Sequence, residues 1–153
     1  MSPAPSPSPA TPVLTGPARR AAAFQRMRDA HSTEMAEDYV ELIGDLIVEM
    51  GEARLTDLAE NLGVTHATAA KVVQRLAREG LVESRPYRSI FLTEAGQTMA
   101  AESRARHKIV HDFLIALGVS EINAEADAEG IEHHVSEETL KVFEKMIGKL
   151  TKR

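Results

Sequence analysis

The sequence predicts a mainly α-helical protein in which an N-terminal winged helix-turn-helix, with a small β-hairpin as its wing, precedes a C-terminal helical domain. Two observations support this fold class. Apolar residues recur at three- and four-residue steps along most of the chain, which is the period of a helix with one buried face. In the middle, two short helical patterns separated by a Gly turn are followed by two short apolar segments, which is the order of a helix-turn-helix and its wing.

The first 33 residues form two segments of unusual composition. Residues 1–17 are rich in Pro, Ser and Ala and have almost no apolar periodicity, so we expect a disordered tail. Residues 18–33 are rich in Ala and Arg and are predicted to form a basic extension with a short helix that ends near His31.

A DNA-reading domain is predicted over residues 34–100, and its first helix spans 34–50. Ser32 or Thr33 is a suitable N-cap for this helix, and acidic residues in the first turn complement the helix dipole. Apolar residues then follow at helical spacing until Gly51, which is expected to end the helix.

The helix-turn-helix itself is predicted from capping and turn residues. A short helix over 55–62 is expected to be capped by Thr56, and Gly63 makes the turn. Thr65 opens the second helix, which runs to Glu79. The two strands of the wing are predicted at 81–84 and 89–92.

The C-terminal domain, residues 101–153, is predicted to be helical. Thr93 caps a long helix that connects the two domains and ends near Leu117. The remaining helices are predicted at 120–124, 126–134 and 136–150.

The exposed face of the second helix of the motif is polar and basic. Residues 64–91 contain five bases and two acids, so positive charge is concentrated on the element that would meet a polyanion. The residues expected to contact DNA are Thr65, His66, Thr68, Lys71, Gln74 and Arg75 on the helix, and Arg85 and Arg88 on the wing. The alternative is an ordinary three-helix domain with a solvated polar face.

Carboxylates and imidazoles at helical spacing indicate a metal site. Glu129, Glu132 and His133 have the i, i+3, i+4 spacing that places three ligands on one helix face. The full candidate ligand set is Asp38, Glu41, His107, Glu129, Glu132 and His133. Oxygen and nitrogen donors without sulfur suit Mn(II) or Fe(II). The alternative is that these charges form solvated helix faces.

Composition excludes several classes of protein. The chain has no Cys, which excludes a disulfide framework, a thiolate metal site and a cysteine nucleophile. No apolar run approaches the length of a membrane-spanning helix, so no membrane partner is predicted and a cytoplasmic location is expected. No recognisable catalytic motif is present, and neither an enzymatic activity nor a small organic substrate is expected.

Four sequence segments together resemble a known family. They are EDYVELI at 37–43, FLTEAG at the end of the wing, RARHKIVHDFL at 104–114 and DAEGIEHHVS at 127–136. The chain resembles the manganese-responsive transport regulators of the diphtheria toxin repressor family. The resemblance implies a homodimer that binds double-stranded palindromic operator DNA and represses manganese uptake genes. It also implies a binuclear manganese site, with two Mn(II) per subunit, on the six candidate ligands.

The resemblance implies a mechanism in which Mn(II) acts as a corepressor. Asp38 and Glu41 belong to the first helix of the DNA-reading domain, whereas the other candidate ligands follow the wing, so a bound metal would fix the angle between the two domains. Three alternatives remain. They are a small dimetal carboxylate and histidine enzyme, an iron-responsive repressor activated by Fe(II), and a winged helix protein whose acidic faces bind another protein.

Overall fold

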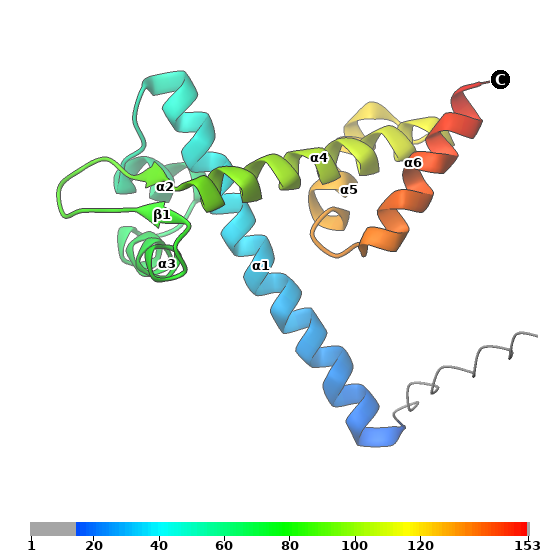
Figure 1. Cartoon of the computed structure of the whole chain (residues 1–153), viewed down its shortest axis with the longest axis horizontal. Coiled ribbons are helices and arrows are strands. Elements are labelled where there is room, and N and C mark those ends of the chain that lie inside the picture. The colour runs from blue at the N-terminus through cyan, green and yellow to red at the C-terminus, as the bar shows by residue number, and fades with distance from the viewer. Residues whose placement is uncertain (1–14, 153) are drawn as a thin grey trace, which may run out of the picture.

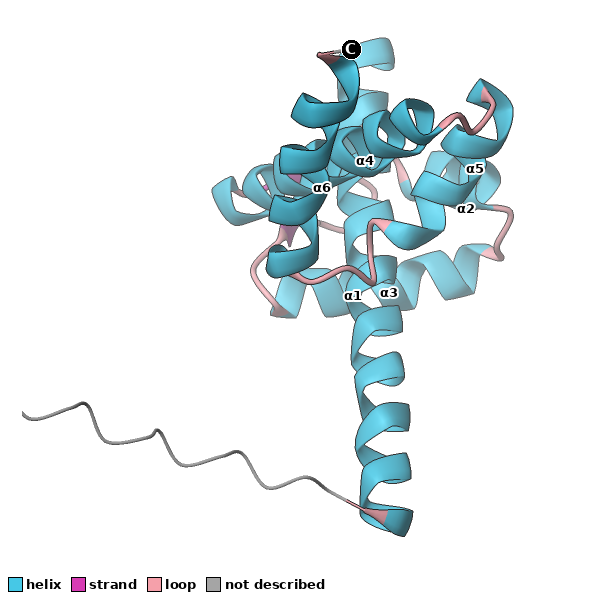
Figure 2. Cartoon of the chain, turned by 90° about the vertical axis from the view of Figure 1, so that its right-hand side faces the viewer, coloured by secondary structure: helices cyan, strands magenta, loops and turns pink. Residues whose placement is uncertain are grey.

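The structure is a computed structural model that describes residues 15–152. In this part of the chain six helices and one two-stranded antiparallel sheet are present, which confirms the predicted fold class (Figures 1 and 2). The elements in chain order are α1 (Gly16–Met50), α2 (Leu55–Leu62), α3 (His66–Arg78), β1 (Val82–Glu83), β2 (Phe91–Leu92), α4 (Glu94–Leu117), α5 (Glu121–Ile131) and α6 (Glu137–Thr151). Most of the tail predicted over 1–17 lies outside the described residues.

Helix α1 is one continuous helix of 35 residues. The prediction of two helices with a cap at Ser32 or Thr33 is therefore wrong. The Thr33 hydroxyl donates to the carbonyl of Asp29, four residues earlier, as a residue inside a helix can. The Ala- and Arg-rich stretch has high helix propensity and contains no Gly or Pro, so nothing interrupts the helix before the apolar stripe begins.

Helices α2 and α3 form the helix-turn-helix, and Gly63 between them has a φ of 66°. Thr65 caps α3 as predicted, because its hydroxyl accepts a hydrogen bond from the Thr68 backbone at 3.1 Å. The predicted cap of α2 is wrong. Thr56 lies inside α2, and the Asp57 carboxylate accepts instead from the backbone N–H before the helix at 3.1 Å.

The wing strands are shorter than predicted. Val82 pairs with Leu92 and Glu83 pairs with Phe91. At one end of the sheet, the Leu81 carbonyl accepts from the backbone of Thr93 in the same register, but Thr93 is already the cap of α4. Before β2, Ile90 pairs with Ala53 instead of with β1.

Helix α4 joins two separate hydrophobic cores (Figure 1). The larger core contains the buried faces of α1 and α3 and the wing, and includes Val40, Ile43 and Leu76. The smaller core is built around Val110 and Leu140, where α4 meets α6. No described helix combines the length and apolar character needed to cross a membrane.

The segment after α4 differs from the prediction. The helices predicted at 120–124 and 126–134 are one helix, α5, because nothing between them breaks the i to i+4 bonding of an Ala-rich segment. The last helix, α6, begins after Ser136 as predicted, since the Ser136 hydroxyl accepts from the Thr139 backbone at 3.2 Å.

Gly96, in the first turn of α4, allows the wing to approach the helix closely. A Cβ at this position would lie 2.1 Å from the backbone oxygen of Leu81. We expect Gly96→Ala to lower the free energy of unfolding by about 1–3 kcal/mol, because the wing backbone must move. Urea unfolding of the metal-free protein measures this change.

Gly148→Ala is the matched control, since a Cβ at this helical position meets nothing within 4 Å. This control should be neutral or stabilise by up to about 1 kcal/mol. A Gly96→Ala variant as stable as the Gly148→Ala variant would contradict the close approach.

Candidate metal centre and nucleic-acid interface

Carboxylates and imidazoles gather where α1 meets α4 and the turn that follows α5. His133 Nε2 lies 3.3 Å from Asp38 Oδ1 and 3.3 Å from Glu132 Oε1. His107 Nδ1 lies 3.1 Å from Glu132 Oε2 and 3.6 Å from Glu129 Oε1. Five of the six residues predicted to bind metal are thus in direct contact, and the Glu132 carboxylate lies between the two imidazoles.

Within residues 15–152, potential ligand atoms form two groups, and in each group they lie within 4.8 Å of one another. The groups are Glu34, Asp38 and His133, and His107, Glu125 and Glu129. Glu34 and Glu125 were not predicted. Each lies four residues before a predicted ligand, so the i, i+4 spacing on a helix is the signal that could have identified them.

Glu41, the sixth predicted ligand, lies half-buried on α1. Burial raises the pKa of its carboxyl group, and the carboxylates of Glu129 and Asp38 act in the same direction. Ser103 and Arg104 oppose this shift of the pKa. Within residues 15–152, Glu41 makes no ion pair with another predicted ligand. It is therefore close to the cluster, but not in contact with it.

The local structure around Glu132 and His133 differs from the predicted helix over 126–134. Helix α5 ends at Ile131, and both residues lie in the following turn. The backbone N–H of Glu132 still donates to the carbonyl of Ala128, four residues earlier. The backbone N–H of His134 donates to the carbonyl of Ile131, only three residues earlier. This tighter turn ends the helix and leaves the His133 ring against α1.

Glu37 is a buried residue at the cluster that the sequence analysis did not single out as a candidate for the site. It is 5% exposed, and its Oε2 accepts a hydrogen bond from His133 Nδ1 at 2.5 Å. Its Oε1 accepts from the Arg106 guanidinium, which also donates to the backbone carbonyl of Glu132 at 3.3 Å. Because Nδ1 is engaged, His133 presents Nε2 to Asp38 and Glu132.

Glu37 could have been suspected from its position. It lies three residues before Val40 on the helix face that is otherwise apolar, where a lone charge requires a partner. Burial opposes ionisation of Glu37, but hydrogen bonds and charges from His133 and Arg106 hold its pKa below the usual range. Glu37 is therefore an ionised, buried acceptor.

The electrostatics of the cluster fit a divalent cation. Glu132 is 2% exposed, and burial raises its pKa to about 7. Its Oε2 is buried and accepts no hydrogen bond in the described part of the chain. Burial disfavours protonated His133, but hydrogen bonds to Asp38 and Glu37 outweigh this and raise its pKa to about 10. An unbonded buried oxygen among oxygen and nitrogen donors suits Mn(II) or Fe(II).

The raised pKa of Glu132 predicts a pH-dependent effect of Glu132→Gln. The pKa of this carboxyl in the folded protein is about 7, above the ordinary value of 4.5. As pH rises from 4.5 to 7, the carboxyl therefore ionises less readily in the folded protein than in the unfolded chain, and the free energy of unfolding falls. In the presence of chelator, the variant should therefore gain Tm relative to the parent at pH 8 and differ little at pH 5. Thermal unfolding followed by circular dichroism tests this, and an equal difference at both pH values would contradict it.

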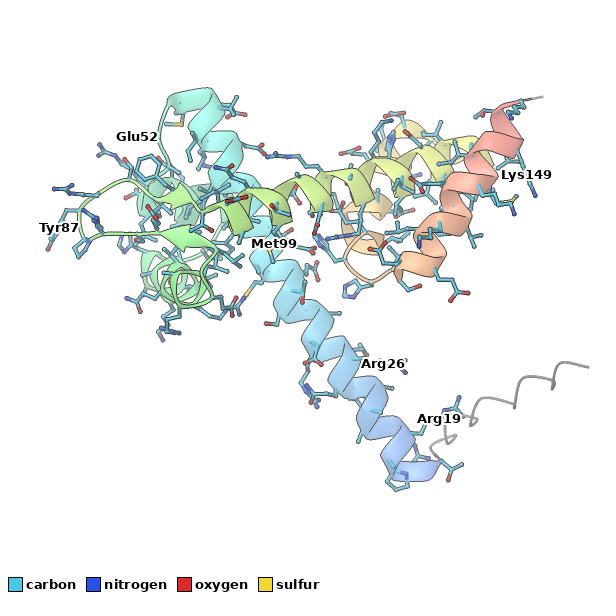
Figure 3. The ribbon with its side chains drawn as sticks, viewed as in Figure 1. Arg19, Arg26, Glu52, Tyr87, Met99 and Lys149 are labelled. Carbon is cyan, nitrogen blue, oxygen red and sulfur yellow. The ribbon has the colours of Figure 1, made fainter. Side chains whose placement is uncertain are left out.

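The predicted DNA-contacting face is exposed in the structure. Thr65, His66, Thr68, Lys71 and Gln74 all face solvent along α3. A groove of about 840 Å³ separates α3 from the wing, and its basic lining residues are Arg54, Arg78, Arg85 and Arg88. The exposed Tyr87 marks the loop of the wing (Figure 3).

Arg75 is placed differently from the other predicted DNA contacts. Its guanidinium donates to the backbone carbonyl of Ser32 on α1 at 3.2 Å, and its Nε lies 3.4 Å from Glu79 Oε1. The side chain is only 29% exposed. Arg75 therefore connects α3 to α1 in this structure.

Comparison with known proteins matches both halves of the chain. Residues 31–90 match the family described as "Iron dependent repressor, N-terminal DNA binding domain". Residues 93–153 match "Iron dependent repressor, metal binding and dimerisation domain". The chain is 57% identical over 120 residues to the transcriptional regulator MntR of Escherichia coli O6:H1, covering 78% of this chain and 77% of the relative.

More distant relatives show the same relationship. The HTH-type transcriptional regulator MntR of Geobacillus kaustophilus is 41% identical over 104 residues, covering 68% of this chain and 74% of the relative. A solved structure titled "Manganese-dependent transcriptional repressor complex with manganese" superimposes with a TM-score of 0.65 and 29% identity. That match covers 74% of this chain and 52% of the solved chain, so the chain spans about half the length of that structure.

Proposed function

The chain belongs to the iron-dependent repressor family, and on this premise we propose that it is a manganese-dependent transcriptional repressor that binds operator DNA as a homodimer. The observation that carries the proposal is the position of Glu132 between the two groups of ligands. One carboxylate oxygen faces His133, whose group includes residues of α1, and the other faces His107, whose group comes from α4 and α5. Its relatives are transcriptional regulators, so the chain is not an enzyme.

The two ligand groups are suited to two manganese ions per subunit. Asp38 and His133, with Glu34 near them, would hold one ion, and His107 and Glu129, with Glu125, would hold the other. Glu132 supplies one oxygen toward each group. Glu41 is near enough to the cluster for the charges of Glu129 and Asp38 to raise its pKa. A bound Mn(II) supplies the positive charge that neutralises these carboxylates.

The chain's own residues connect metal binding to DNA binding. Without a cation, the carboxylates of α1 and α5 repel one another, which loosens the contact between α1 and the C-terminal half. Asp38 and Glu41 lie on α1, and Arg75 attaches α3 to that helix, so a tightened cluster restrains the recognition helix as well. Such coupling is typically about 1–3 kcal/mol and reciprocal, so operator DNA should also raise manganese affinity.

The DNA-binding part is proposed to be residues 34–100, with the ligands of α1 shared between the two domains, and residues 101–153 are proposed to form the dimer. In a dimer, two α3 helices at fixed separation would enter successive major grooves. Exposed apolar side chains on the C-terminal helices offer surface for the partner subunit. They include Ile115, Leu117, Ile122 and Val142. We place the protein in the cytoplasm, where its DNA lies.

Fluorescence anisotropy on a labelled fragment of the upstream region of its own gene tests the proposal. We expect operator binding to appear on titration with Mn(II) at fixed salt and to disappear with chelator. Parallel titrations with Fe(II) and Zn(II) rank the metals. Tight binding without metal, or no binding with any metal, would contradict the proposed function.

Lys71→Ala separates DNA contact from metal binding. Lys71 is exposed on α3, and in residues 15–152 it forms no ion pair with a candidate ligand. The variant should bind operator more weakly with a smaller salt dependence, whereas its manganese affinity without DNA should match the parent. Loss of manganese affinity would contradict this separation.

A further inference from the structure

The N-terminal part of α1 extends away from the rest of the molecule (Figures 1 and 2). Residues 16–31, here called the basic arm, are exposed or half-buried throughout, and the buried residues of α1 begin only at Ala36. At a rise of about 1.5 Å per residue, the arm is about 24 Å long. Nothing in the metal centre or in the helix-turn-helix requires this length of helix.

The basic arm carries strong positive charge. Its arginines are Arg19, Arg20, Arg26 and Arg28, and its single acid is Asp29. In residues 15–152, none of these arginines forms an ion pair with an acidic side chain, and Arg28 donates only to Gln25 at 2.8 Å. The charge reverses at Glu34, where the acidic part of α1 begins.

The arm leaves the body beside the recognition helix. The contact between the Arg75 guanidinium and the Ser32 carbonyl joins α3 to α1 directly after the arm ends. Arg28 lies one helical turn before Ser32, on the same side of α1. Arg19 and Arg26 follow further out along the arm (Figure 3).

We propose that the basic arm binds the phosphate backbone of the DNA next to the major groove that α3 enters. This inference rests on the proposed function, since it requires operator DNA at α3. The charge of the arm is complementary to phosphate, and the arm starts at the edge of the DNA-reading face. Because the arm continues a packed helix, it needs no separate nucleation to remain helical.

A second copy of the chain is a poorer occupant of this surface. The large exposed apolar residues of the arm are Phe24 and Met27, which form too small a stripe for a stable helix pair. Two arms side by side would also bring eight arginines together and repel each other.

The test is operator binding by the full chain carrying Arg19→Gln, Arg20→Gln, Arg26→Gln and Arg28→Gln together, at saturating Mn(II) and several salt concentrations. We expect affinity near 100 mM salt to fall at least about tenfold. The negative slope of log affinity against log salt should become shallower by at least about 1.8. This change corresponds to the loss of one phosphate contact by each of the two arms of the dimer. Manganese affinity without DNA should stay at the parent value.

The matched control removes the same charge from α6 and the residue after it, with Lys141→Gln, Lys145→Gln, Lys149→Gln and Lys152→Gln. It should leave affinity and slope nearly unchanged (Lys149 is labelled in Figure 3). An equal loss in both variants, or no loss in the arm variant, would overturn the inference. Failure of the parent protein to bind operator with Mn(II) would instead overturn the proposed function.

Phe24→Ala with Met27→Ala tests the second-copy alternative. This variant should keep the parent's mass in sedimentation and its operator affinity. A lower mass in sedimentation, together with loss of operator binding, would show that the arm binds a second chain. This result would overturn the inference.

Discussion

Manganese-dependent operator binding is expected to be abolished by Glu132→Gln, while the metal-free protein keeps its fold. Glu132 is the buried carboxylate that faces both His107 and His133, and its Oε2 accepts no hydrogen bond in the described residues. An amide of the same shape removes the negative charge that a cation requires and adds donors where only acceptors are needed. Manganese titration by calorimetry and operator anisotropy measure the two losses.

We expect manganese affinity of this variant to fall at least about 100-fold, since one carboxylate serves both ligand groups. Circular dichroism of the metal-free variant should match the parent. Asp127→Asn is the control, because it removes an exposed carboxylate from α5, the helix that precedes Glu132. A Glu132→Gln variant that still responds to manganese like the parent would show that the metal site lies elsewhere.

Glu37→Gln is expected to weaken both manganese binding and the fold, although Glu37 is not itself a predicted ligand. The Glu37 carboxylate accepts from His133 Nδ1 and from Arg106, and this orients His133 Nε2 toward Asp38. Loss of such an orienting partner typically lowers metal affinity about 10- to 100-fold. Arg106, whose side chain is 18% exposed, would also lose its buried counter-charge, which costs about 3 kcal/mol of stability.

Urea unfolding in chelator and manganese calorimetry measure these two effects of Glu37→Gln. Asp45→Asn is the matched control, because Asp45 also pairs with an arginine of α4, Arg104, at 2.6 Å. Both partners of this pair are about half exposed, so its loss should cost less than about 1 kcal/mol and leave manganese affinity unchanged. Equal effects of the two substitutions would contradict the positioning role of Glu37.

Sequence alone determined the features that depend on neighbouring residues along the chain. Gly63 and Thr65 located the turn and the cap of α3, since a positive φ and a free backbone N–H are local requirements. The apolar period located the helices, and the excess of bases over residues 64–91 indicated the DNA-reading element. The spacing of Glu129, Glu132 and His133 singled out side chains that the structure brings into one cluster, although α5 ends before two of them.

The tertiary structure decided what depends on contact between elements. The packing of α1 against α4 and the turn after α5 brings Glu37 to Arg106 and His133. The same packing places Glu34 and Glu125 in separate ligand groups. The same packing engages Arg75 with α1. Periodicity shows which face of a helix is buried but not which helix covers it. A charged residue on that face can be interpreted only once its partner, distant in sequence, is known.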